Sequence, residues 1–311
     1  MKAEAAVYEM FLALWPLFSL IVGGYLLRRL DFPGEAFWPA SERLNYFILF
    51  PALLFSSLVS APLHNPQLPR LALAVLLCLA IAWCGLLVVR RLRGWPAARF
   101  GPLTQGVLRF NTYLGLAAIG SLYGAQGLSL AALMLALLVP ACNVLAVWSL
   151  SAEQGVNMGT LLRSMLKNPL ILACLAGALY NLSGLGLPPG SDRLLGLLGA
   201  TSLPMGLLCV GAALNPKMLR GEGRALGWNC AVRLLLMPLL AFAVARALGL
   251  PVLESSILIL FFALPTAPTA YVLTRQLGGD SHLMAGIITL QTLLAALSLI
   301  GVLALLQHSF A

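Results

Sequence analysis

Ten runs of apolar residues, each more than 20 residues long, follow one another along the chain. A helix that crosses the hydrocarbon core of a bilayer needs roughly 20 such residues. Only 9% of the 311 residues are charged, whereas a soluble domain averages about 25%. We therefore predict an all-α polytopic membrane protein with ten transmembrane helices, over residues 6–28, 36–60, 70–90, 103–124, 127–150, 160–182, 191–214, 225–247, 253–275 and 282–307.

Lys and Arg are unevenly distributed between the two sets of connections. The connections after the first, third, fifth, seventh and ninth segments hold about three times as many as the other connections and the ends. Because basic loops are retained in the cytoplasm, we expect these connections inside the cell and both termini outside. The basic residues form no patch with interleaved aromatics, so the expected partner is the lipid bilayer and not a nucleic acid.

The two halves of the chain share a weak proline pattern. Trp15-Pro16-Leu17 in the first segment matches Asn168-Pro169-Leu170 in the sixth. Phe50-Pro51-Ala52 in the second segment matches Leu203-Pro204-Met205 in the seventh, at the same offset. With five segments in each half, such repeats must have opposite orientations, as in many secondary carriers. We therefore predict two inverted five-helix repeats, residues 1–150 and 151–311.

The ninth segment is interrupted by two prolines, Pro265 and Pro268. Proline lacks an N–H and clashes with the carbonyl four residues back, so the helical hydrogen bonds should break here. A second polar interruption, from Arg109 to Gly115, lies in the fourth segment. Broken helices at membrane depth commonly build the substrate site of a transporter. The alternative is a kinked helix that only packs within the bundle.

Two arginines lie inside apolar segments, Arg109 in the fourth and Arg233 in the eighth. All ten acids lie in loops or within about two turns of a segment end, which argues against proton or sodium exchange at a carboxylate as the main activity. An anionic substrate could be the partner of either guanidinium. Alternatively, each arginine reaches the membrane boundary or bonds carbonyls that the prolines leave free.

The candidate substrate-binding residues are those at or near the two interruptions. An amide such as that of Asn111, beside a helix break, can hold a carboxylate or close the break. Hydroxyl and amide groups in membrane helices also bond within and between helices, and that alternative stays open. The six cysteines have no metal-ligand spacing and no nucleophile–base pair is apparent, so we expect neither an enzyme nor a cofactor. The candidates are Asn111, Arg109, Thr112, Tyr113, Pro265, Thr266, Pro268, Thr269, Tyr271, Arg233 and Gln291.

Three motifs resemble the auxin efflux carrier family, which includes the plant PIN-formed auxin exporters and bacterial malonate-type carriers. They are Leu44 to Phe55 (LNYFILFPALLF), Arg109 to Tyr113 (RFNTY) and Leu264 to Leu273 (LPTAPTAYVL). The resemblance implies a fold like that of the bile-acid sodium symporters. Helices 1, 2, 6 and 7 would form a scaffold, through which homodimers are expected, and helices 3–5 and 8–10 a transport domain that moves like an elevator.

By the same resemblance, helices 4 and 9 would cross where they unwind, and a carboxylate would bind there at Asn111, Pro265 and Pro268. The chain departs from the family's pattern at Ala117, where a proline is common after Gly115-Leu116. A softer break in the fourth helix is therefore expected. The chain also lacks the long cytoplasmic loop of the plant exporters, and its short loop is what a bacterial member would have.

We therefore predict a secondary transporter of a small organic anion in the bacterial inner membrane, with both termini periplasmic. The substrate would be a mono- or dicarboxylate, malonate- or auxin-like, moved by alternating access. Two alternatives remain. One is a sodium-coupled organic-anion symporter of the bile-acid type, and the other is a membrane sensor that binds a ligand without moving it.

Overall fold

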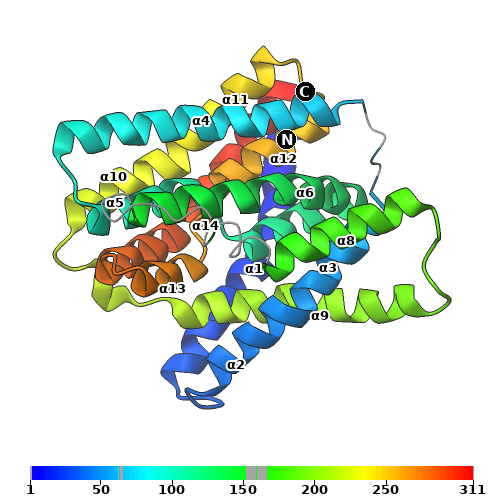
Figure 1. The fold of residues 1–311 in the computed structure, drawn as a ribbon, viewed down its shortest axis with the longest axis horizontal. Helices are drawn as coiled ribbons and strands as arrows, with labels where there is room; N and C mark the ends of the chain where they lie inside the picture. Colours follow the sequence, from blue (N-terminus) through cyan, green and yellow to red (C-terminus); the bar gives the residue numbers. More distant parts are fainter. Residues whose placement is uncertain (1, 62, 64–65, 152–158, 160–166, 311) are drawn as a thin grey trace.

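The computed structural model describes residues 2–61, 63, 66–151, 159 and 167–310, and every regular element of these residues is a helix (Figure 1). The helices are α1 (Lys2–Arg29), α2 (Phe37–Leu44), η1 (Asn45–Leu49), α3 (Phe50–Val59), α4 (Leu68–Arg93), α5 (Ala97–Leu108), α6 (Thr112–Leu150), α8 (Pro169–Ser183), α9 (Ser191–Ala213), η2 (Pro216–Leu219), α10 (Gly223–Ala231), η3 (Val232–Leu236), α11 (Met237–Ala247), α12 (Val252–Ala263), α13 (Thr269–Gln276) and α14 (Ser281–Phe310).

The prediction of an all-helical polytopic membrane protein is confirmed. By length and composition, seven helical stretches of the described residues can cross a membrane. One of them, Ala97–Leu150, has 54 residues, far more than the roughly 20 that a single crossing needs. It contains the break before α6 and a bend at Gly124, whose φ is 59°. Two of the predicted segments correspond to the shorter apolar helices Pro169–Ser183 and Val252–Ala263; residues 160–166 of the first lie outside the described residues. The count of ten remains a prediction.

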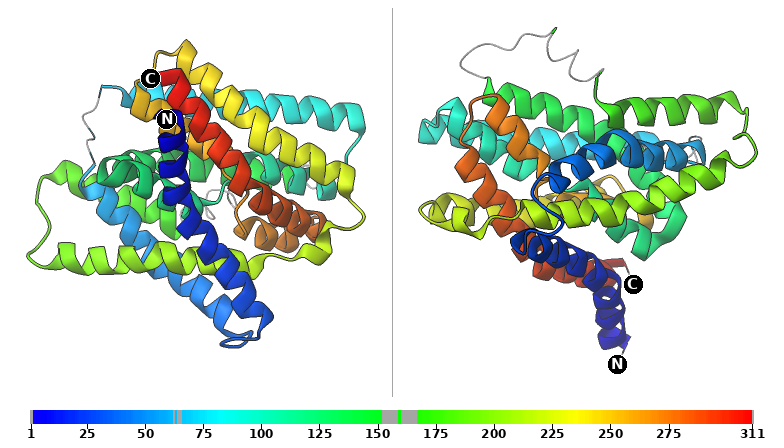
Figure 2. Two further views of the ribbon diagram at one scale, coloured as in Figure 1. Left: turned by 180° about the vertical axis from the view of Figure 1, so that it is seen from behind. Right: turned by 90° about the horizontal axis from the view of Figure 1, so that it is seen from below.

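The helices pack in two groups. In the first group, α1 lies along α9, while α3 packs against both α8 and α9. In the second, α5 packs on α6 and α14, and α12 packs on α11, α6 and α14. The start of α1 and the end of α14 lie near each other in every ribbon view (Figures 1 and 2), which agrees with the expectation that both ends lie on one side of the membrane.

Two glycines allow α1 and α9 to approach closely. A Cβ atom at Gly24 would collide with the backbone of Leu208, and one at Gly211 would collide with the backbone of Ile21. The Arg28 guanidinium then donates to the Ala212 carbonyl at 2.6 Å. Close backbone contact between small residues is a common way to join helices in a membrane. Here it packs α1 tightly against α9 within the first group.

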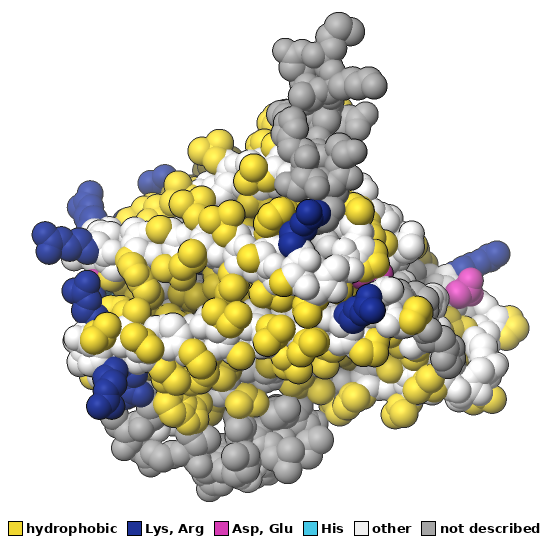
Figure 3. Space-filling view, turned by 90° about the horizontal axis from the view of Figure 1, so that it is seen from above, with side chains coloured by type: hydrophobic (Ala, Val, Ile, Leu, Met, Phe, Trp, Pro, Cys, Tyr) yellow, Lys and Arg dark blue, Asp and Glu magenta, His cyan; other side chains and the backbone are white. Residues whose placement is uncertain are grey.

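The surface is apolar. Hydrophobic side chains are spread over the whole described part of the face in Figure 3, while many of the Lys and Arg side chains lie toward its edges. Large side chains such as Leu179, Leu197 and Leu297 are more than half exposed. A soluble protein rarely exposes so much contiguous apolar surface, whereas a bilayer would cover it.

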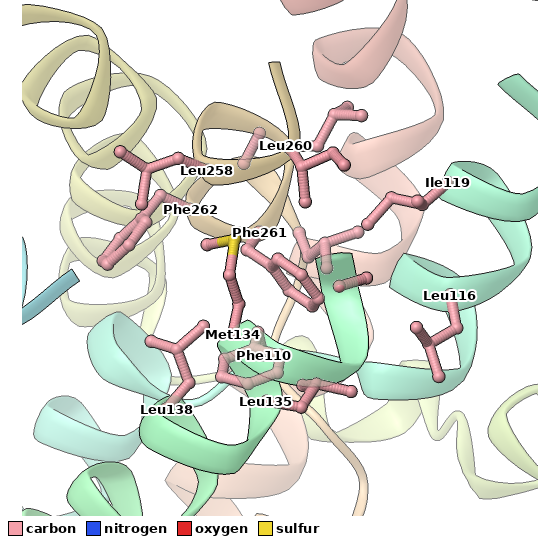
Figure 4. Packing of buried hydrophobic residues seen from close by; sticks show 14 of the residues in the cluster. Phe110, Leu116, Ile119, Met134, Leu135, Leu138, Leu258, Leu260, Phe261 and Phe262 are labelled. Carbon is pink, nitrogen blue, oxygen red and sulfur yellow. The ribbon is translucent and has the colours of Figure 1, made fainter. Parts of the chain in front are cut away.

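The core nearest the helix breaks is aromatic. Phe110, in the break before α6, meets Phe261 of α12 edge to face, with ring centroids 5.3 Å apart. Met134, Leu135 and Leu138 of α6 lie close to the pair (Figure 4). Both phenyl rings are buried, so packing holds the non-helical segment before α6 in a fixed position.

Candidate functional site

The helix that would continue from α5 stops at Leu108. Arg109 has an extended backbone with ψ 148°, and α6 begins only after Asn111. Asn111 is the N-cap of α6, because its side-chain oxygen accepts a hydrogen bond from the Leu114 N–H at 3.1 Å. Asparagine is among the best residues for this role. The helix is therefore fully interrupted even though Ala117 replaces the expected proline.

A second break separates α12 from α13. The helix ends at Ala263, residues 264–268 are not helical, and α13 begins at Thr269. Pro265 and Pro268 explain the interruption, since neither can donate a helical hydrogen bond. The two breaks touch, because the Asn111 N–H donates to the Pro265 carbonyl at 2.7 Å. We call residues 109–111 and 264–268 the paired breaks; two helices end there and two begin.

The two helices that end at the paired breaks are held by one side chain. The guanidinium of Arg233 is fully buried and donates at 2.6–2.8 Å to three carbonyls that the breaks leave free, those of Val107, Phe261 and Leu264. A cation also balances the negative end of a helix dipole. Bonding to freed carbonyls was one of the sequence-based interpretations of Arg233, and the structure contains these bonds. Arg233 does not line the cavity described below.

A second buried network lies beside Arg233. The side-chain oxygen of Gln291 accepts from the N–H and the hydroxyl of Thr266, at 2.9 and 2.8 Å. Its nitrogen donates to the Gly106 carbonyl and to the Asn229 side-chain oxygen, at 2.9 and 2.8 Å. Every polar atom of the Gln291 amide thus has a protein partner. Thr266, Gln291 and Pro265 join helices, and none of them lines the cavity.

Gln291→Leu is expected to lower the free energy of unfolding by roughly 2–4 kcal/mol, because it leaves the Thr266 N–H and the Asn229 oxygen buried without this partner. The measurement is denaturant or thermal unfolding of the purified chain in detergent. Thr292→Val is the matched control, since the one partner of the Thr292 hydroxyl among the described residues is the Ile288 carbonyl, one turn back. Equal stability of the two variants would contradict the structural role of Gln291.

A cavity of about 610 Å³ opens on the other side of the paired breaks. Six of the eleven candidate residues line this cavity. Of the other five, four belong to the buried contacts described above, and Tyr271 has its side chain on the surface. Most of the cavity wall is apolar by area, as is usual for small-molecule sites, although about half of its residues carry a polar or ionisable group. The candidates that line it are Arg109, Asn111, Thr112, Tyr113, Pro268 and Thr269, and the other polar or ionisable residues are Glu42, Arg43, Tyr46, Cys142, Asn143, Asn168, Cys209 and Gln276.

Three helices begin at this cavity. Thr112 and Tyr113 start α6, Thr269 starts α13, and Asn168 is the N-cap of α8. The first N–H groups of a helix have no intrahelical acceptor, and the positive end of the helix dipole lies with them. Anions bind well where such ends meet. The carbonyl groups at the paired breaks accept hydrogen bonds from Arg233, which compensates their negative charge. The electrostatic field in the cavity therefore favours an anion.

The side-chain amide of Asn111 is the polar group of the cavity that most directly indicates a ligand site. Asn111 is fully buried, and its side-chain nitrogen has no hydrogen-bond partner among the described residues. A buried donor left unpaired costs about 1–3 kcal/mol, so such groups commonly mark a functional site. Arg109 is half-buried beside it, and within the described part of the chain its side chain makes one hydrogen bond, to the Gln105 oxygen at 3.2 Å. Both side chains therefore have donors left for a ligand.

Asn168 and Glu42 are among the lining residues that sequence reasoning did not select. Asn168 was noticed only as part of the proline repeat, although an Asn-Pro step at a helix start is a cap signal. Glu42 was set aside because it lies within two turns of a segment end, yet the cavity extends to that end. Across the described ranges, no three His, Cys, Asp or Glu side chains gather closely enough to hold a metal ion.

Comparison with known proteins agrees with this architecture. Residues 153–303 match the family described as "Membrane transport protein". The chain is also 26% identical, over 295 residues, to an uncharacterized transporter of Methanothermobacter thermautotrophicus; the match covers 90% of this chain and 93% of the relative. Both matches are to membrane transport proteins, and they agree with the resemblance of the motifs to the auxin efflux carrier family.

Proposed function

We propose that the chain is a secondary carrier of a small organic anion, whose carboxylate binds at the paired breaks. One observation carries this proposal: the buried, unpaired side-chain nitrogen of Asn111 lies on a cavity where three helices begin. An oxygen of the substrate carboxylate would accept from that nitrogen. A hydrogen bond to a charged group is worth about 1.5–3 kcal/mol, enough to make this contact decisive for affinity.

Other groups around Asn111 would complete the carboxylate site. The N–H groups of Thr112 and Thr269 lie at the starts of α6 and α13, where the first N–H groups of a helix have no intrahelical acceptor and the helix dipole favours a negative charge. Arg109 would supply a full positive charge and Tyr113 an aromatic wall, since its ring packs on Phe50 at 4.8 Å. A mono- or dicarboxylate fits these groups.

The cavity lies between the two groups of helices, which supports movement by an elevator. Glu42, Tyr46 and Cys209 come from α2, η1 and α9, whereas Asn111 and Thr269 come from the paired breaks and α13. We take α1–α3, α8 and α9 as the scaffold and α4–α6 with α10–α14 as the transport domain. Within this proposal the halves 1–150 and 151–311 are inverted repeats that together make ten crossings.

The sodium-coupled alternative would need free oxygen atoms near the paired breaks. The carbonyls of Val107, Phe261 and Leu264 are bonded to Arg233. The Thr266 hydroxyl and the Gly106 carbonyl bond each other at 2.9 Å. The positive charge that a sodium ion would bring is already supplied by the Arg233 side chain, so these contacts favour a carrier that works without sodium.

The test is solid-supported-membrane electrophysiology on proteoliposomes that contain the purified chain. Acetate, lactate, malonate and benzoate are applied in sodium and in choline buffers. We expect a carboxylate-evoked current that changes less than about twofold when choline replaces sodium, because the carbonyl oxygens are already occupied. A current only in sodium would establish the symporter alternative. Binding of an acid without current or tracer uptake would establish the sensor.

A further inference from the structure

We propose that Gln105 is a positioning residue of the anion site, which directs the Arg109 guanidinium toward the substrate and ties it to α13. The inference rests on the proposed anion carrier, because it concerns the cation of that site. Gln105 is fully buried in the last turn of α5 and does not line the cavity. It therefore acts on the substrate only through Arg109.

A chain of hydrogen bonds leads from the backbone of α13 to Arg109. The Thr274 hydroxyl donates to the Ala270 carbonyl at 2.8 Å. The Gln105 side-chain nitrogen donates to the Thr274 hydroxyl oxygen at 2.8 Å, and the Gln105 side-chain oxygen accepts from the Arg109 guanidinium at 3.2 Å. We call the side chains of Gln105 and Thr274 the relay.

The donors and acceptors of the relay allow one arrangement. A guanidinium has only N–H donors, so the amide oxygen of Gln105 must face Arg109. The amide nitrogen then faces Thr274, whose oxygen accepts, and the hydroxyl proton is left for the Ala270 carbonyl. If the amide turned over, its NH₂ group would meet the donors of the guanidinium. Thr274 therefore sets the orientation of the amide, and the amide holds the guanidinium.

Arg109 needs this support because α5 ends just before it. Its backbone is extended, with ψ 148°, so no helical turn packs against the side chain. A flexible side chain that becomes fixed only when a ligand binds reduces the affinity for that ligand. One N–H donor of the guanidinium bonds Gln105, and the others have no hydrogen-bond partner among the described residues. The relay thus fixes the positive charge before the anion arrives.

The relay also joins the two paired breaks. Thr269 and Leu273 of α13 line the cavity, whereas Ala270 and Thr274 are fully buried on the face of α13 that packs against α5. The bond between α5 and this buried face keeps Arg109 in a fixed place relative to the start of α13, so one carboxylate meets both. Every member of the relay belongs to the proposed transport domain and moves with the substrate.

A double-mutant cycle on substrate affinity tests the proposal. Acetate, lactate, malonate and benzoate are titrated calorimetrically into the purified full chain in detergent, and the acid that binds wild type most tightly is used throughout. The compared proteins are wild type, Gln105→Met, Arg109→Met and the double variant. Methionine keeps the length of the glutamine side chain without its donor and its amide oxygen.

We expect Gln105→Met to weaken binding roughly fivefold to tenfold, because the substrate itself must then fix the arginine. In the Arg109→Met background the same change should alter the affinity by less than about twofold, since no guanidinium is left to orient. Equal losses in the two backgrounds would identify general support of the fold and overturn the inference. An unchanged affinity in either single variant would also overturn it, while leaving the rest of the anion site standing.

Two Thr274 variants give a readout that does not depend on the folding of Gln105→Met. Thr274→Val removes the acceptor of the amide nitrogen and should weaken binding roughly threefold or more. Thr274→Ser keeps the hydroxyl and should bind as wild type does. Equal affinities of these two variants would contradict the relay. Failure of wild type to bind any of the acids would overturn the anion carrier, and the inference with it.

Discussion

Asn111→Asp should abolish carboxylate binding while leaving the protein folded. The change replaces the unpaired side-chain NH₂ group with an oxygen, so the substrate loses a donor and meets a negative charge. Loss of a hydrogen bond to a charged group together with like-charge repulsion corresponds to a decrease in affinity of about 100-fold or more. The measurement is calorimetric titration of the purified chain with the acid that gives the largest transport current.

Asn111→Asp isolates the ligand contact from the capping role. The side-chain oxygen of Asn111 caps α6 through the Leu114 N–H, and aspartate caps as well as asparagine. Asn111→Ala would lose both functions. Asn143→Ala is the matched control, because Asn143 is another amide on the cavity wall but lies far along α6 from its N-terminus. An unchanged affinity in Asn111→Asp, or an equal loss in Asn143→Ala, would contradict the assigned site.

Arg233→Met should cause the largest loss of stability of any single arginine substitution. It removes three hydrogen bonds of 2.6–2.8 Å at once and leaves three buried carbonyls without this partner. At about 1–3 kcal/mol for each unsatisfied group, the free energy of unfolding should fall by roughly 3–5 kcal/mol. Arg233→Lys should rescue little, because an ammonium lacks the planar fork that reaches three carbonyls.

Unfolding in detergent, followed by circular dichroism at increasing temperature, checks this expectation. Arg193→Met is the control, since Arg193 is an exposed residue of α9 and its loss should change the free energy of unfolding by less than about 0.5 kcal/mol. If Arg233→Met were as stable as Arg193→Met but unable to bind the substrate, Arg233 would be a substrate contact instead of a support for the paired breaks.

Local chemistry made the two helix breaks predictable. Pro265 and Pro268 cannot continue a helix, and Asn111 is a strong cap, so both interruptions followed from residue types and spacing. The all-helical membrane class followed from the apolar runs in the same way. The number of crossings stays a prediction, because α6 continues to Leu150 through the bend at Gly124 and Pro169–Ser183 is short for a crossing.

The partners of the buried polar residues could not be predicted, because they lie far away in the sequence. Arg233 bonds Val107, which is 126 residues earlier, and Gln291 bonds Gly106 across 185 residues. Only tertiary packing decides that these two side chains support the paired breaks while Asn111 lies on the cavity. Glu42 shows the same limit, since the distance of a residue from a segment end does not reveal how far a cavity extends.

The central claim is that the cavity beside Asn111 carries a carboxylate across the membrane, and tracer counterflow tests it most directly. Proteoliposomes are loaded with an unlabelled acid and diluted into a trace of the same labelled acid, so no coupling ion or membrane potential is needed. Wild type should accumulate label transiently above its external concentration, and Asn111→Asp should not. Binding of the acid by wild type without any accumulation would contradict the claim and identify a receptor.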